Sequence, residues 1–212
     1  MMPPMDKIKS ETGMGVWLTR GARRAVIPLS LVILAACEAA PLPPPIPEIT
    51  FSHLAPIEIA TAQIEVVEDY VPPLTPPNVE HKFPTPPAQA VRQWAKDRLH
   101  LVGDDGVLRV IIRDASVIET KLEKTGGVRG AFTVDQSERY DARLEVVVEV
   151  RSVRGFQDAF ASAIAERSRT VAEDISLYDR ELVFFEMTKS MMDDLNAELE
   201  KNIRQFFARF VR

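Results

Sequence analysis

The segment from Tyr140 to Arg151 places an apolar side chain at every second position, and this pattern allows few folds. The apolar positions are Tyr140, Ala142, Leu144, Val146, Val148 and Val150. Successive side chains of a strand point to opposite faces of the sheet, so one face of this strand is apolar and the other is polar. The segment therefore predicts an antiparallel sheet with one covered face and one face in water.

The next segment, Phe156–Val171, fits two structures. Its alanines favour a helix by intrinsic propensity, and Phe156, Phe160 and Ile164 would then share one helical face. Read as a strand, the segment alternates alanines with other residues, and its Ser168–Val171 end is rich in β-type residues. We expect a strand, because the long strand before it needs a pairing neighbour.

Two further regions carry strand patterns. The first runs from Ile57 to Glu68, and its alternation changes parity near Ala60, which predicts a bulge or bend there. The second runs over Val107–Ile112 and resumes over Ile118–Leu122. Both are short runs of β-branched and apolar residues, as expected for strands in a sheet.

Two helices have recognisable ends. The first is predicted to have Thr85 as its N-cap, Pro86 at its first position and Gly103 just past its end. The second begins at Ser176, with Asp179 three residues on, and is expected to run roughly 33 residues to Arg209, or about 50 Å. A typical strand spans only ~17–20 Å, so we expect the end of this helix to overhang the sheet.

The predicted element order is β-α-β-β-β-α. It indicates an α+β fold with a single four-stranded, mostly antiparallel sheet and two helices packed on one face. The apolar faces of the long strand and the last helix should meet in one core. Its expected members are Tyr140, Leu144, Val146, Val148, Leu195, Leu199 and Ile203.

The N-terminal region has the features of a secretory signal. Three arginines precede the apolar run Val26–Ile33, which ends in Leu34-Ala35-Ala36-Cys37. These four residues resemble the lipobox of bacterial lipoproteins, and Met14 is an alternative start that keeps signal-peptide proportions. The resemblance implies that Cys37 is acylated, becomes the first residue of the mature chain and anchors it to a membrane. The alternative is a buried free cysteine in an ordinary N-terminal helix.

The predicted organisation has three parts. Residues 1–36 form the lipoprotein signal peptide, residues 37–48 the lipidated cysteine with a proline-rich tether, and residues 49–212 a periplasmic α+β domain. The prolines favour an extended polyproline II stalk. A docking site for an SH3-like partner is the alternative interpretation of this stretch.

The charge excludes one class of partner. Removal of residues 1–36 takes away five basic and two acidic residues, which changes the net charge from −5 to −8. An acidic chain lacks the electrostatic footprint of a nucleic-acid-binding protein. Cys37 is the single cysteine, so no disulfide framework is expected.

The sequence predicts no catalytic residue, no metal site and no cofactor. Its three histidines, His53, His81 and His100, lie far apart without metal-ligand spacing. No nucleophile elbow or phosphate-binding loop is present. The glycines of 126–130 could cradle an anion, but they fit a hairpin or bulge better.

The element order behind a lipobox resembles the lipopolysaccharide-assembly lipoprotein that plugs the outer-membrane translocon barrel, and also auxiliary lipoproteins of lipid-transporting ABC systems. The resemblance implies a non-catalytic accessory subunit of an envelope complex, with an envelope protein as its partner. The alternatives are a lipid-binding lipoprotein of an ABC-type system, with lipid or lipopolysaccharide as ligand, and an envelope hydrolase. Glu38 stands where an aspartate would commonly retain a lipoprotein in the inner membrane, so we expect the outer membrane, at its periplasmic face.

The partner surface is predicted where apolar residues lie outside the regular pattern. The loop Tyr70–Pro87 is too long and too rich in proline for a simple connection. Together with the overhanging helix end, it should present an exposed apolar cluster. The predicted members are Leu74, Phe83, Phe206, Phe207 and Phe210. The alternative is that the loop packs on its own domain.

Overall fold

A computed structural model describes residues 42–123, 136–151 and 156–212. Its main sheet is built around β6 (Gln136–Arg151), which pairs along one edge with β7 (Gln157–Ala172). The other edge of β6 is shared by β4 (Val107–Asp114) and β5 (Val117–Lys121), which follow each other along it. These pairings are antiparallel, while β2 (Gln63–Glu68) pairs with β4 in parallel. The predicted strand over 156–171 is confirmed.

A second, small sheet joins β1 (Ile57–Ile59) to β3 (Leu99–Leu101) in parallel. The sequence predicted a single four-stranded sheet, and this is wrong in strand number. The region 57–68 forms two strands of different sheets, separated where the apolar alternation changes parity near Ala60. The region 107–122 also forms two strands, because the register of the β4–β6 pairing shifts after Ile112.

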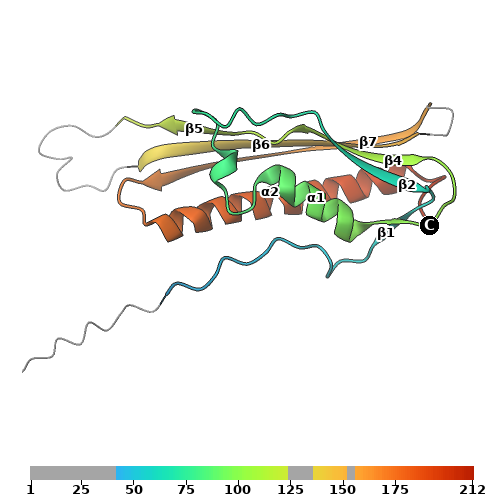
Figure 1. Ribbon diagram of the computed structural model, residues 1–212, viewed down its shortest axis with the longest axis horizontal. Coiled ribbons are helices and arrows are strands. Elements are labelled where there is room, and N and C mark those ends of the chain that lie inside the picture. The colour runs from blue at the N-terminus through green and yellow to red at the C-terminus, as the bar shows by residue number, and fades with distance from the viewer. Residues whose placement is uncertain (1–41, 124–135, 152–155) are drawn as a thin grey trace, which may run out of the picture. The chain divides into compact units, whose positions relative to one another are not determined.

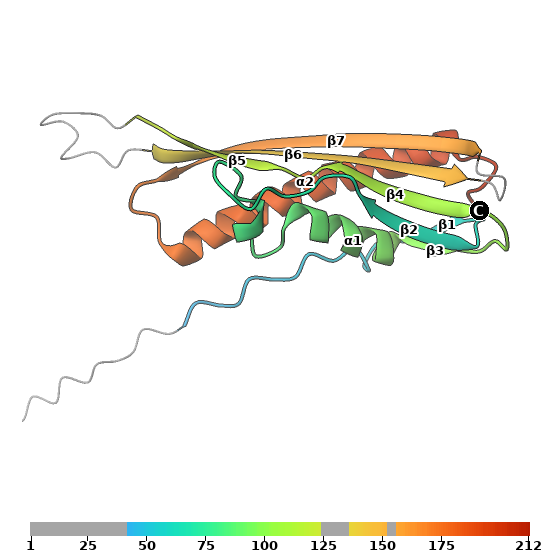
Figure 2. The same cartoon turned by 45° about the horizontal axis from the view of Figure 1, so that its top comes forward.

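The helices α1 (Pro87–Arg98) and α2 (Leu177–Phe206) lie on the same face of the main sheet, as Figures 1 and 2 show. A single turn of 3₁₀ helix, η1 (Glu80–Lys82), precedes α1. The α+β class and the two helices on one face are as predicted. We call α1 and α2 together the helix layer, and the opposite face of the sheet the outer face.

The core lies between the sheet and the helix layer, and all seven of its predicted residues are buried. Four of the buried positions on β7 are alanines, Ala159, Ala161, Ala163 and Ala165, which pair with Val150, Val148, Val146 and Leu144 of β6. Short side chains on this strand leave room for α2 to pack closely against it. Alanine therefore serves the packing of a strand here, although its propensity favours helix.

The boundaries of α1 differ from the prediction. Its N-cap is Pro86, and its C-cap, Leu99, is already extended and enters β3. Thr85 does not cap the helix; its carbonyl accepts a hydrogen bond from Thr188 Oγ1 on α2 at 3.2 Å. Gly103 has a different role from a helix stop, because a Cβ there would lie 2.4 Å from the carbonyl carbon of Ala60. Glycine is needed at this position for a close approach of two backbone segments.

The last helix begins as predicted, with the Ser176 hydroxyl accepting the Asp179 amide at 3.1 Å. Its expected overhang is wrong. The helix has 30 residues, about 45 Å, whereas β6 and β7 have 16 residues each, about 53 Å. The strands are about three times the usual length, so they match the helix.

Candidate partner-binding surface

The five residues predicted to form the partner surface do not lie together. Leu74 and Phe206 are 63% and 56% exposed. Phe83 and Phe207 are buried, so the prediction that they lie on a surface is wrong, and Phe210 is partly buried against the core. Phe83 stacks on Phe184 of α2 in the core. Phe207 is the C-cap of α2, and its amide donates a hydrogen bond to the Ile203 carbonyl.

The proline-rich loop and the end of α2 lie beside different positions along β6. The loop is hydrogen-bonded to β5, where the Val79 amide donates to the Val117 carbonyl at 2.9 Å, and Val117 pairs with Ala142. After α2, the Phe210 carbonyl accepts a hydrogen bond from the Ala60 amide at 2.7 Å. Ala60 lies just before β2, whose first residue is opposite Val107 of β4, and Val107 pairs with Arg151 of β6. These two positions, Ala142 and Arg151, are nine residues apart along β6, which is about 30 Å. The two segments therefore cannot form one binding surface.

A buried polar network holds the loop in place. The Glu80 carboxylate accepts hydrogen bonds from the Tyr70 hydroxyl at 2.8 Å and the Val117 amide at 3.2 Å. Asn78 donates to the same hydroxyl at 3.1 Å. Burial, together with the hydrogen bond to Glu80, raises the pKa of Tyr70, so the hydroxyl stays protonated as a donor. The loop is thus fixed to its own domain, which was the alternative interpretation of its sequence.

The outer face of the sheet is uncovered within the part of the chain that the structure describes (Figure 2). Phe160 and Ile164 of β7 point to this face and are 48% and 52% exposed. Phe156, just before β7, is 68% exposed. Exposed large apolar side chains in one area mark interaction sites more often than isolated ones do.

An apolar row crosses the sheet beside these side chains. Its members lie opposite one another in the strand register, and they are Val67, Ile111 and Val147. Ile111 and Val147 are buried, although no element that the structure describes covers them. Their neighbours along each strand are charged, and the alkyl stems of such side chains cover apolar surface.

Ion pairs flank the apolar row on both sides. On one side Arg109 bonds Glu149 at 2.9 Å and Glu65 at 3.2 Å, and Arg151 bonds Glu149 at 2.7 Å. On the other side Arg143 contacts three carboxylates, those of Asp114, Glu145 and Glu166. The charges next to the row are therefore paired within the sheet, which reduces the desolvation needed when a partner covers them.

Two pKa shifts reflect these ion pairs. Burial alone would raise the pKa of Glu149, but hydrogen bonds donated by Arg151 and Arg109 outweigh it and hold the pKa below the usual value. Hydrogen bonds to Glu145 and Glu166 raise the pKa of Arg143. Both shifts favour the charged form, so the ion pairs stabilise the charges of Glu149 and Arg143.

We name Phe160, Ile164, Val147, Ile111 and Val67 the outer patch. Sequence reasoning missed it, although the signal was present. In Phe156–Ala165 the alanines occupy one face, so Phe160 and Ile164 necessarily occupy the other. The strand interpretation of this segment therefore already implied an apolar outer surface on β7.

The structure offers little for catalysis or metal binding. His53, His81 and His100 are exposed and lie in different segments. Among the described residues, no group of three or more His, Cys, Asp or Glu side chains could hold a metal ion. In the same residues, no helix has the length and apolar character needed to cross a membrane. The predicted lipobox, Leu34 to Cys37, and the glycines of 126–130 lie outside the described residues.

A groove of about 510 Å³ lies between residues 46–50 and the start of α1. Its lining includes Glu48, Thr50, Thr85, Gln89 and Gln93. A second cavity of about 430 Å³ lies on the outer face, beside Ser116, Asp141, Arg143 and Glu166. The first of these linings is mostly polar and does not resemble the apolar pocket that an acyl chain requires, whereas apolar atoms make up the larger part of the second lining.

Comparison with known proteins gives limited information. No family model and no curated protein matches the sequence. Among solved structures, the chain is similar to the rare lipoprotein B from Shewanella oneidensis, with 17% sequence identity and a TM-score of 0.35. This match covers 66% of the present chain and 95% of the other. A TM-score of this size does not establish a shared fold or function.

Proposed function

We propose that this chain is a membrane-anchored periplasmic lipoprotein that acts as a non-catalytic accessory subunit of a cell-envelope complex, in lipopolysaccharide assembly or lipid transport. The observation that carries the proposal is the sequence Leu34-Ala35-Ala36-Cys37 at the end of a short apolar run that follows three arginines. Such a run is too short to span a bilayer and is typical of a cleaved signal. Acylation of Cys37 would supply the membrane anchor.

The fold supports an interaction role for the anchored domain. One face of its sheet is covered by the helix layer, and the outer face carries the exposed side chains of the outer patch. Two strands of this face, β6 and β7, are unusually long and tie the patch to a continuous core. A rigid surface of this kind suits binding to another protein, because little conformational entropy is lost on association.

The lipid-binding alternative has less support. Its cavity would have to hold acyl chains, yet the groove of about 510 Å³ is lined mostly by polar groups, and the cavity of about 430 Å³ on the outer face is bordered by charged side chains, those of Asp141, Arg143, Glu166 and Arg167. The hydrolase alternative needs an acid and base pair in a cleft, and the exposed histidines do not provide one. We therefore place the function at the protein surface. Because Glu38 rather than an aspartate follows Cys37, we place the protein in the outer membrane.

Cell fractionation tests the proposal. The Cys37→Ser variant should stay unprocessed or become soluble, because stable anchoring needs two or more acyl chains. Ala40→Ser, a similar change three residues later, should leave the protein in the membrane fraction as a control. Density-gradient separation should place the wild type with the outer membrane. A Cys37→Ser protein of mature size in the membrane fraction would contradict the proposal, and wild type in the inner-membrane fraction would contradict its location.

A further inference from the structure

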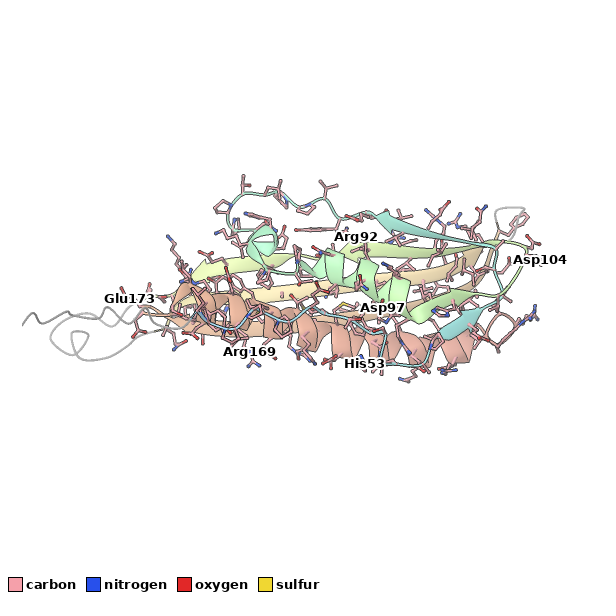
Figure 3. The ribbon with its side chains drawn as sticks, turned by 60° about the horizontal axis from the view of Figure 1, so that its bottom comes forward. His53, Arg92, Asp97, Asp104, Arg169 and Glu173 are labelled. Atoms are coloured by element: carbon pink, nitrogen blue, oxygen red, sulfur yellow. The ribbon has the colours of Figure 1, made fainter. Side chains whose placement is uncertain are left out.

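Residues 46–56, which we call the strap, run along the side of the helix layer that faces away from the sheet (Figure 3). The strap has no regular secondary structure, yet Ile49 and Phe51 are buried in the core cluster. Ile46 and Leu54 pack against the same cluster. These four apolar side chains attach the strap along its length, so it belongs to the folded domain and is not part of a free stalk.

Polar contacts with α1 hold the middle of the strap. Asp97 Oδ2 accepts the Phe51 amide at 2.8 Å and the Thr50 hydroxyl at 2.9 Å. Asp97 Oδ1 accepts Gln93 Nε2 at 2.8 Å, which orients the carboxylate. Both oxygens are thus engaged, and Asp97 clamps two adjacent residues of the strap. Figure 3 labels Asp97 on α1 and His53 on the strap.

A buried arginine holds the end of the strap. Arg98 donates through Nη1 to the Ala55 carbonyl and through Nη2 to Glu200 of α2, and its Nε donates to Asn196 at 3.0 Å. The same Asn196 oxygen accepts Trp94 Nε1 at 2.9 Å. This one network joins the strap to both helices, so the strap is held fixed to the helix layer.

Attachment of the strap shortens the reach of the anchor. Cys37 and Ile46 are nine residues apart, which is about 28 Å in polyproline II geometry. If the strap were free up to Ile57, twenty residues, about 62 Å, would separate the anchor from the domain. The long strands measure about 53 Å. A free strap would let any face of the domain approach the membrane. The attached strap keeps the side of the domain on which it lies nearest to the membrane.

We propose that the strap orients the domain on the membrane, with the helix layer held toward the lipid surface and the outer face turned away from it. This inference rests on the proposed acylation of Cys37. The orientation comes from the short chain and not from charge, because the exposed surface of α2 carries acidic residues, among them Asp193, Asp194 and Glu198. The outer patch would then remain open to a partner in the periplasm.

Energy transfer on vesicles tests the orientation. The full-length acylated protein would be reconstituted in phosphatidylethanolamine and phosphatidylglycerol vesicles that carry an acceptor dye on the headgroups. A donor dye would be attached to a cysteine introduced as His53→Cys on the strap or as Ile164→Cys on the outer face. Two packed layers of about 10 Å each separate these positions, so transfer from His53→Cys should be about twofold higher or more.

Two further variants separate the strap from other effects. A flexible Gly/Ser insertion of about 20 residues after Pro45 should remove the difference between the two donor positions while leaving every strap contact intact. Asp97→Ala should reduce the difference by loosening the middle of the strap, with circular dichroism confirming that the domain stays folded. A changed fraction of phosphatidylglycerol should leave the wild-type ratio unchanged, because charge does not set the orientation.

The outcomes distinguish this inference from the proposed function. Equal transfer from both positions in acylated, membrane-bound protein would overturn the orientation alone. Higher transfer from Ile164→Cys would overturn it as well. Absence of an acyl group on Cys37 would overturn the proposed function and, with it, this inference.

Discussion

Phe83, at the end of the proline-rich loop, stacks on Phe184 of α2 with ring centroids 4.2 Å apart and planes 8° apart. Tyr140 of β6 packs against the same Phe184 ring edge-on, at 4.9 Å. The three rings join the loop, the long helix and the central strand. The loop is therefore part of the core, although its prolines prevent regular secondary structure.

Removal of the Phe83 ring should destabilise the whole domain. Phe83→Ala should lower the free energy of unfolding by about 3–5 kcal/mol, the range for large core aromatics. Leu74→Ala, in the same loop but exposed, should change it by less than ~0.5 kcal/mol. Urea unfolding followed by circular dichroism measures both. Similar values for the two variants would show that the loop does not complete the core.

The contact between α2 and the sheet gives a second prediction. Leu199 is fully buried on α2, so Leu199→Ala should cost about 2–5 kcal/mol in the free energy of unfolding. Lys201→Ala, two residues on and exposed, should cost about 0.5 kcal/mol or less. A loss below ~0.5 kcal/mol for Leu199→Ala would mean that this face of the helix is not packed.

The regular elements could be predicted because each repeats a single pattern. The alternation in 140–151 and the 3–4 spacing of Leu195, Leu199 and Ile203 each define one apolar face, and both faces are buried as expected. The strand at 157–172 was predictable from the need of β6 for a neighbour, even though alanine favours helix.

The errors arose where contacts distant in sequence decide the structure. Leu99–Leu101 continues the helical pattern, but pairing with Ile57–Ile59 makes it a strand. Phe83 packs against Phe184, about a hundred residues away, and Phe207 lies in the irregular turn after α2, so no local pattern marks either of them as buried. The overhang was wrong because strand length was taken from a typical value, whereas β6 and β7 have 16 residues each.

The ion pairs of the outer face predict a pH dependence. Hydrogen bonds from Arg151 and Arg109 hold the pKa of Glu149 below its ordinary value of 4.5. A lowered pKa in the folded state gives stability that is complete above the unfolded-state pKa and is lost as the pH falls through the folded-state pKa. Glu149→Gln should therefore cost roughly 1–2 kcal/mol at pH 7, with allowance for the partly exposed arginines.

The difference between wild type and Glu149→Gln should begin to shrink as the pH falls below the ordinary pKa of 4.5 and should vanish once the pH has fallen through the lowered folded-state pKa, where the wild-type carboxylate is protonated. Thermal or urea unfolding from pH 7 to pH 3 measures it. Glu198→Gln, an exposed carboxylate beside Lys201, serves as the matched control and should show a change of at most about 0.5 kcal/mol. A constant Glu149→Gln difference over this range would contradict the assignment.

The outer patch predicts a separation of binding from stability. Phe160→Ser combined with Ile164→Ser should reduce complex formation in cells by about tenfold or more, since exposed apolar anchors dominate interfaces. Both side chains point away from the core, so the melting temperature should stay nearly unchanged. Crosslinking at native expression level, followed by mass spectrometry of the partner, measures the complex.

Phe206→Ser provides the control for this experiment. Phe206 is also an exposed phenylalanine, but it lies at the end of α2 and outside the outer patch. Its replacement should leave complex formation unchanged. Loss of the complex in Phe206→Ser, with retention in the double variant, would move the partner surface to the helix end.

The most direct test of the account is the intact mass of the mature protein isolated from its native membrane. We predict a chain that begins at Cys37 and carries a diacylglyceryl group on its sulfur, with residues 1–36 removed. The N-terminal peptide should contain all of the added mass, and Cys37→Ser should lack it. A mature chain that retains residues 1–36, or one that begins elsewhere with an unmodified Cys37, would contradict the central claim.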